Sequence, residues 1–309
     1  MRDYSKNPFI VIWEVTRACE LKCLHCRAEA QYRRDPRELS FKEGEHLIDQ
    51  IYEMDNPLFV FTGGDPLMRE DLYDLADYAV QKGVRVSMTP SATPLVTKKA
   101  IQKAKEVGLS RWAFSLDGPN AVIHDYFRGT SGSFDLTTNA IDYLNELEIP
   151  VQINTTVSRY NLNHLEEMAQ LVEKLNAVLW SVFFLVPAGR GKKEDMITPE
   201  EHEIVLNWLY DLDQLSSFDV KTTEAHHYQR IKLQRKKQEK RNRRYPASNG
   251  NSPQTTNDLG RAPIGIRDGS GFLFISHTGD VYPSGFLPVP CGNVRKTPLA
   301  DIYRNSSVF

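Results

Sequence analysis

Two periodicities alternate along the first two thirds of the chain. Short runs rich in β-branched and aromatic residues recur, and between them apolar residues repeat every three or four positions, which puts them on one face of a helix. The runs that predict strands cover residues 10–16, 58–62, 84–88, 112–116, 151–156 and 179–185. These strand-then-helix units predict a parallel sheet with helices packed on its outer face.

Residues with preferences for helix ends support these boundaries. Ser40 and Glu43 have the spacing of a capping box, and Thr198 followed by Pro199 is typical of a helix start. Gly108 follows the last apolar residue of another helical segment and is typical of a helix end. We therefore expect helices between consecutive strands.

The predicted fold class is α/β, as a partial (β/α)6 TIM-like barrel, with an open doubly wound sheet as the competing architecture. Both architectures collect ligands at the carboxyl ends of their strands. Functional side chains are therefore expected in the loops that directly follow the strands.

The alternation of strands and helices breaks near residue 218. Residues 232–244 hold eight Lys or Arg and one acidic residue, and residues 246–263 are polar and rich in turn-forming types. The basic run is either a solvated helix face or a docking surface for an anionic substrate or a redox partner. We assign residues 1–218 to the barrel, 219–262 to a basic and polar linker, and 263–309 to a small β-rich extension.

Composition narrows the class of protein. The apolar fraction of 40% and the charged fraction of 25% are those of an ordinary globular chain, and the net charge of −2 predicts no general attraction to nucleic acid or anionic membranes. The sequence has no apolar run long enough for a transmembrane helix, and residues 1–8 lack the apolar core of a signal peptide. We expect a cytoplasmic protein.

Three of the four cysteines lie close together, directly after the first predicted strand. Cys19, Cys23 and Cys26 have the spacing C-x3-C-x2-C, and clustered cysteines indicate metal or redox chemistry. One loop can then give three thiolates to a [4Fe–4S] cluster and leave one iron open for another ligand. A structural zinc site is the alternative, but it needs a fourth ligand: His25 is too close to Cys26, and Cys291 would have to come from far away.

The C-x3-C-x2-C motif after the first strand of a β/α-repeat chain resembles the radical S-adenosylmethionine (SAM) superfamily. The resemblance covers roughly residues 8–215. It implies a [4Fe–4S] cluster on Cys19, Cys23 and Cys26, with the amino and carboxylate groups of SAM on the open iron. It also implies cleavage of SAM to methionine and a 5′-deoxyadenosyl radical, which abstracts a hydrogen atom from a substrate.

The loop after the second predicted strand, Thr62-Gly63-Gly64-Asp65-Pro66, is similar to the family's glycine-rich motif for the SAM amino group. Glycines allow close backbone approach, and Asp65 can accept from an ammonium group, although Glu is the usual acid there. On this interpretation, Gly64→Val blocks SAM binding and leaves the iron content near normal.

The resemblance implies further SAM contacts after later strands. It assigns Ser115 and Arg128 to the SAM carboxylate, Asn154 to the ribose or methionine, and the backbone near Leu185 to the adenine. Ser91 is a weaker candidate for the ribose. Read without the resemblance, Ser115 belongs to a polar turn and Arg128 to a surface salt bridge.

The tail resembles the opening of a SPASM or twitch extension, which carries auxiliary iron–sulfur clusters in peptide-modifying enzymes and has relatives in haem-pathway enzymes. Ser284 stands where many relatives have a cysteine, and Cys291 is the tail's one thiol. An auxiliary cluster is therefore expected only if the chain continues in a longer protein.

Two substrate classes remain open. The resemblance implies either a ribosomally made peptide or a tetrapyrrole whose propionate side chains are modified. It also implies an electron donor such as flavodoxin or ferredoxin, and it names no catalytic side chain.

Overall fold

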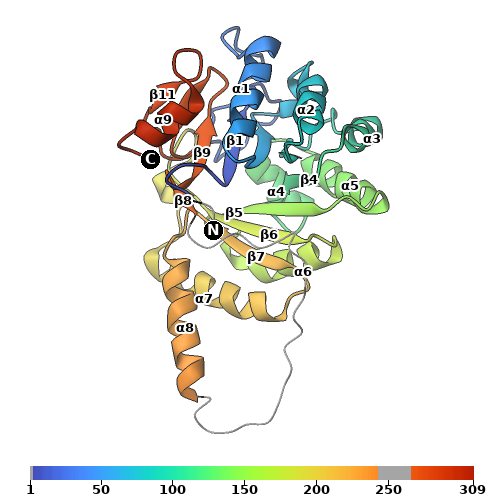
Figure 1. Ribbon diagram of the computed structural model, residues 1–309. Coiled ribbons are helices and arrows are strands. Elements are labelled where there is room, and N and C mark those ends of the chain that lie inside the picture. Colours follow the sequence, from blue (N-terminus) through green and yellow to red (C-terminus); the bar gives the residue numbers. More distant parts are fainter. Residues whose placement is uncertain (1–2, 243–265) are drawn as a thin grey trace.

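The computed structural model describes residues 3–242 and 266–309 (Figure 1). Seven parallel strands follow one another in chain order across the sheet. They are β1 (Ile10–Glu14), β2 (Leu58–Thr62), β3 (Val86–Met88), β4 (Arg111–Ser115), β5 (Val151–Val157), β6 (Leu179–Phe184) and β7 (Asp219–Thr223). The predicted parallel sheet is thus confirmed. Within the described residues the sheet does not close, because β7 ends it on one side and the tail strands end it on the other.

Helices follow the parallel strands along the chain, and Figure 1 shows most of those between β1 and β7 on the outer side of the curved sheet. They are α1 (Phe41–Glu53), α2 (Leu72–Gln81), α3 (Lys98–Val107), α4 (Ala121–Arg128), α5 (Ser133–Glu146), α6 (Leu165–Lys174), α7 (Pro199–Leu215) and α8 (Tyr228–Asn242), with 3-10 turns at Pro66–Met68, Leu162–His164 and Lys193–Asp195. The predicted capping box at Ser40 with Glu43 forms, and the helix start predicted at Thr198 carries a second capping box, with Glu201. None of the described helices has the length and apolarity that crossing a membrane requires.

The core lies between the sheet and the helices. Large side chains on alternating strand positions are fully buried there, and the ring of Trp13 stacks on Phe59 with centroids 6.3 Å apart. Gly44 lets α1 approach this layer, since a Cβ atom there would lie 2.9 Å from the Trp13 ring. The intervening strand positions, such as Ser115 and Asn154, point to the opposite, concave face.

The prediction of a linker beginning at residue 219 is wrong for residues 219–242, because this segment contains β7 and α8. β7 pairs in parallel with β6, from Asp219 opposite Leu179 to Thr223 opposite Phe183. Its single buried residue, Val220, gives too short an alternation to predict a strand. Residues 243–262 of the expected linker lie outside the described residues.

The basic helix α8 packs on α7 through ion pairs. Arg230 pairs with Glu203, Arg235 with Asp211, and Lys232 with Asp213. Acidic side chains of α7 thus compensate part of the basic run, and α8 is a partly solvated helix held to its neighbour.

The tail continues the same sheet beyond β1. β9 (Gly271–Ile275) pairs in parallel with β1, β10 (Asp280–Tyr282) is antiparallel to β9, and β11 (Gly292–Asn293) is antiparallel to β10. The short β8 (Arg267–Asp268) pairs with β9, and α9 (Leu299–Asn305) lies near α1. β9 and β10 form a hairpin, and its turn holds Gly279 at φ +85°. This pairing brings the tail to the carboxyl end of β1.

Candidate active site

The three clustered cysteines lie in the long loop between β1 and α1. Cys19 and Cys23 are buried around Leu21, and the half-buried Cys26 packs against them together with Ala30. All three thiols are free, and the loop leaves β1 at its carboxyl end, as the sequence predicts for a ligand site.

Hydrogen-bond donors surround the cysteine sulfurs. The backbone N–H groups of Leu21 and Ala30 each lie 3.4 Å from a sulfur, those of Cys19 and Cys26 respectively. The Ser91 hydroxyl lies 3.4 Å from Cys19 Sγ and donates to the carbonyl of Gly64. Burial raises the pKa of the Cys19 thiol to about 11, so a bound metal would be needed to hold it as a thiolate at neutral pH.

The donor set fits an iron–sulfur cube. In a cubane each thiolate binds a different iron, so its three ligands do not converge on one point. Among the residues that the structure describes, no three His, Cys, Asp or Glu side chains are close enough to hold a single metal ion. Three soft thiols in one loop, with backbone donors on their sulfurs, are the ligand set that a [4Fe–4S] cluster would require.

The glycines after β2 pack against the cysteine loop itself. A Cβ atom on Gly63 would lie 2.6 Å from the Thr16 carbonyl, and one on Gly64 would lie 2.4 Å from the Ala18 carbonyl. The Asp65 N–H donates to that same Ala18 carbonyl over 2.6 Å. Any side chain at Gly64 would therefore push away the backbone that carries Cys19. The expectation that Gly64→Val spares the iron content overlooked this contact.

Asp65 is fully buried and holds two loops together. One carboxylate oxygen accepts from the Thr93 hydroxyl over 2.7 Å, and the other accepts from the backbone N–H groups of Leu67 and Ser91. Burial raises the pKa of Asp65 to about 6, against the opposing effect of these hydrogen bonds. The structure thus gives Asp65 internal partners, and its contact to the SAM ammonium stays a prediction.

Arg128, at the end of α4, reaches the cysteine loop. Its guanidinium pairs with Asp117 over 2.7 Å and lies 3.5 Å from Cys23 Sγ. Burial by itself would lower the pKa of Arg128, but the charges of Asp117 and Cys23 outweigh it and raise that pKa. Arg128 is therefore a buried cation beside Cys23, not a surface residue.

Two histidines lie near this pair: His25 is half-buried and His124 is fully buried. His25 stacks on Phe127 with ring centroids 4.2 Å apart, and burial lowers its pKa well below the usual value. His124 accepts from the Asp117 N–H at Nδ1 and lies 3.2 Å from the Ser133 hydroxyl at Nε2. Because burial lowers the pKa of His124 to about 2, the ring is neutral and carries its proton on Nε2.

The remaining predicted site residues lie on or just after later strands. Ser115 ends β4 opposite Asn154 of β5, and Asn154 pairs with Ser181 of β6. Leu185 directly follows β6 and donates its N–H to the Val157 carbonyl. Their strands open on the same rim as the cysteine loop.

The loop after β6 supplies residues that sequence reasoning missed. A Cβ atom on Gly189 would lie 2.4 Å from the Cys26 carbonyl, and the Arg190 side chain donates to the Cys23 carbonyl over 2.9 Å. The sequence linked this loop to adenine, but these two residues contact the cysteine loop. The Gly-Arg-Gly run was the one signal that could have pointed to a tight backbone approach.

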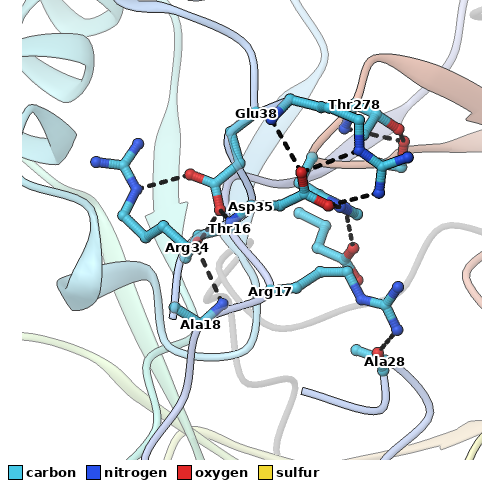
Figure 2. Close-up of polar contacts among 12 residues, drawn as sticks. Thr16, Arg17, Ala18, Ala28, Arg34, Asp35, Glu38 and Thr278 are labelled. Carbon is cyan, nitrogen blue, oxygen red and sulfur yellow. Dashed lines mark hydrogen bonds and ion pairs between the residues drawn. The ribbon is translucent and has the colours of Figure 1, made fainter. Parts of the chain in front are cut away.

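Glu38 holds the other end of the cysteine loop, as Figure 2 shows. Its carboxylate accepts from the Thr16 hydroxyl over 2.5 Å and from Arg34 over 2.7 Å. The loop is thus anchored at both ends by buried polar contacts.

Comparisons with known proteins agree with this geometry. Residues 13–172 match the Radical SAM superfamily. The chain is 44% identical over 311 residues to the AdoMet-dependent heme synthase of Nitratidesulfovibrio vulgaris (strain Hildenborough). The match covers 100% of this chain and 82% of that protein. The chain therefore belongs to the radical SAM superfamily. It is an enzyme of the kind that uses a [4Fe–4S] cluster and SAM (AdoMet), and the structural zinc alternative gains no support.

Other relatives match part of the chain. The Fe-coproporphyrin III synthase of Methanosarcina barkeri (strain Fusaro) is 37% identical over 65% of this chain and 50% of its own length. The mycofactocin maturase MftC of Mycolicibacterium smegmatis is 33% identical over 65% of this chain and 52% of its own length. The structure of Streptococcus suis SuiB bound to its precursor peptide SuiA has a TM-score of 0.72 at 16% identity, covering 98% of this chain and 66% of that one. That likeness concerns the fold alone, and it is consistent with the predicted SPASM-type subgroup.

Proposed function

We propose that this chain is a radical SAM enzyme that modifies the propionate side chains of an iron tetrapyrrole in haem synthesis. The supporting observation is the extent of the match to the heme synthase, which runs through the tail as well as the barrel. The peptide maturase matches 65% of the chain. A peptide substrate is therefore the second candidate.

The cluster ligands are proposed from the cysteine loop. Cys19, Cys23 and Cys26 bind a [4Fe–4S] cluster, and Arg128 stays charged beside Cys23 at 3.5 Å. When bound and reduced, the cluster and SAM together supply a 5′-deoxyadenosyl radical that abstracts a hydrogen atom from the substrate. The reducing electron comes from a donor such as flavodoxin or ferredoxin.

SAM is proposed to bind on the rim that the strand ends form. The Gly63–Asp65 loop lies against the backbone before Cys19, one of the proposed cluster ligands, and this contact supports a SAM site there. The residues proposed to contact SAM are Gly63, Gly64, Asp65, Ser115, Arg128, Asn154 and Leu185. Their task is to bind and orient SAM, and the packed loops around Cys19 and Cys23 keep water away from the cluster.

We propose a division into two domains that is based on how the strands pair. The radical SAM core comprises residues 1–218 with β7 added at its edge, and residues 266–309 form a twitch-like extension whose β9 joins the core sheet.

An anaerobic assay tests the proposal. The protein, reconstituted with iron and sulfide and then reduced, is incubated with SAM and iron coproporphyrin III, and the products are analysed by mass spectrometry. We expect 5′-deoxyadenosine together with a tetrapyrrole altered at its propionates. SAM cleavage with an unaltered tetrapyrrole would contradict the substrate, and a protein that takes up only zinc and leaves SAM intact would contradict the enzyme.

A further inference from the structure

A cavity of about 300 Å³ opens next to the cysteine loop. One side is formed by that loop with Arg17, Arg27 and Ala28, and the other by the β9–β10 hairpin with His277 and Tyr282. Because Arg17 precedes Cys19 by two residues and Arg27 follows Cys26 directly, the cavity lies beside the proposed cluster ligands.

Three arginines line this cavity, and two of them are paired. Arg27 lies 2.7 Å from Glu14 and over the Phe274 ring, and Arg37 pairs with Asp35 over 2.6 Å. The same two carboxylates also face His277, at 3.0 Å from Glu14 and 3.5 Å from Asp35. The acids around the cavity are therefore already engaged.

The third cation, Arg17, has no carboxylate partner in the described part of the chain. Its guanidinium donates to the Ala28 carbonyl, as Figure 2 shows, and its Nε–H is buried without an acceptor. A guanidinium with unused donors at a cavity wall favours an anionic ligand, and a carboxylate matches its planar donors well.

We propose that this cavity binds a carboxylate of the substrate, with Arg17 as its main partner. The inference rests on the proposed function and deepens it, since the carboxylate is that of a tetrapyrrole propionate. The half-buried Tyr282 and the exposed Pro288 give the cavity an apolar rim for the edge of the macrocycle. A propionate held here would anchor the tetrapyrrole against the loop that carries the cluster.

Binding titrations of the reconstituted protein test this assignment. The absorbance of iron coproporphyrin III and of its methyl ester is followed for the wild type, for Arg17→Gln, and for the control Arg230→Gln on α8. Glutamine keeps a donor for the Ala28 carbonyl and removes the charge. We expect the Kd of the free acid to rise roughly tenfold to a hundredfold in Arg17→Gln, from the loss of one charge-assisted hydrogen bond, with no difference for the ester.

A second pair of variants covers the case in which Arg17→Gln loses iron. Pro288→Glu puts a negative charge on the rim without touching the cysteine loop, and Pro288→Gln is its neutral match. Pro288→Glu should weaken binding of the free acid alone, and equal binding by both variants would overturn the assignment.

The other outcomes separate this proposal from the function. If the wild type binds and converts the tetrapyrrole but Arg17→Gln binds the acid equally well, the cavity is wrongly assigned. The cavity is also wrongly assigned if Arg17→Gln loses affinity for the acid and the ester equally. It is wrongly assigned too if Arg17→Gln loses affinity for SAM instead, since Arg17 would then hold the SAM carboxylate. A wild type that binds neither tetrapyrrole would overturn both proposals.

Discussion

Arg128 and Asp117 form a buried ion pair at the junction of α4, β5 and the cysteine loop. Asp117 also accepts from the Thr156 N–H over 2.7 Å, so the pair links three segments. Removing one partner of a buried pair leaves a charge without compensation, which costs far more than the pair itself contributes.

Arg128→Met is therefore expected to lower the free energy of unfolding by about 3–5 kcal/mol. The double variant with Asp117→Asn should recover part of that loss, because the stranded carboxylate is gone. Urea unfolding at pH 7 measures both variants. Additive losses would show that the two residues are not energetically coupled.

The neutral His124 makes stability depend on pH. Burial lowers its pKa in the folded protein to about 2, from an ordinary value of 6.5. Below pH 6.5 the unfolded chain binds a proton that the folded protein does not, so this residue's contribution to stability falls as the pH falls. The slope is up to about 1.4 kcal/mol per pH unit.

His124→Gln is expected to be less stable at pH 8 but to have a shallower decline between pH 7 and pH 5. Unfolding in urea at several pH values measures this, with the exposed His226→Gln as the control. An unchanged slope in His124→Gln would mean that the ring titrates normally in the folded protein.

At the scale of elements, glycines on three separate turns make room for the cysteine loop. They are Gly64 after β2, Gly129 after α4 and Gly189 after β6. A Cβ atom at these positions would lie 2.4, 2.5 and 2.4 Å, respectively, from a carbonyl oxygen of that loop. The loop's position is thus set by backbone packing from three sides.

Gly64→Ala is accordingly expected to lose most of the iron after reconstitution, because even one methyl group would displace Ala18 and with it Cys19. Gly83→Asn is the control, since nothing lies within 4 Å of a Cβ atom there and Asn tolerates its positive φ of 87°. Iron quantitation of both variants tests this prediction. If Gly64→Ala kept a normal iron content but lost SAM binding, Gly64 would act on SAM alone and the predicted effect on the cysteine loop would be wrong.

The sequence predicted the elements whose signals are local. Strands such as β2 carry a strong apolar run, and Ser40 with Glu43 caps α1 within four residues. β7 could not be predicted because its one buried residue is Val220, and its identity as a strand depends on pairing with β6.

Contacts between distant segments were also beyond the sequence. The cysteine spacing predicts the cluster ligands, but nothing near Gly64 shows that its neighbour is the Ala18 carbonyl. Nothing near Arg190 shows that it donates to the Cys23 carbonyl. Such contacts follow from which loops the folded sheet brings together.

At the scale of the whole molecule, the pairing of β9 with β1 joins the tail to the site. It brings His277 to 3.0 Å from Glu14, across 263 positions of the chain, and makes the hairpin one wall of the arginine-lined cavity. Barrel and tail therefore line one continuous cavity beside the cysteine loop.

The proposed function depends on Cys19, Cys23 and Cys26 holding a cluster that cleaves SAM. The most direct measurement is 5′-deoxyadenosine released per protein by the reconstituted, reduced chain, alongside its iron content. We expect release by the wild type and by Cys291→Ala. Cys19→Ala, Cys23→Ala and Cys26→Ala should release none and should also lose the cluster. Release by any of those three variants, or loss of the cluster in Cys291→Ala, would contradict this assignment.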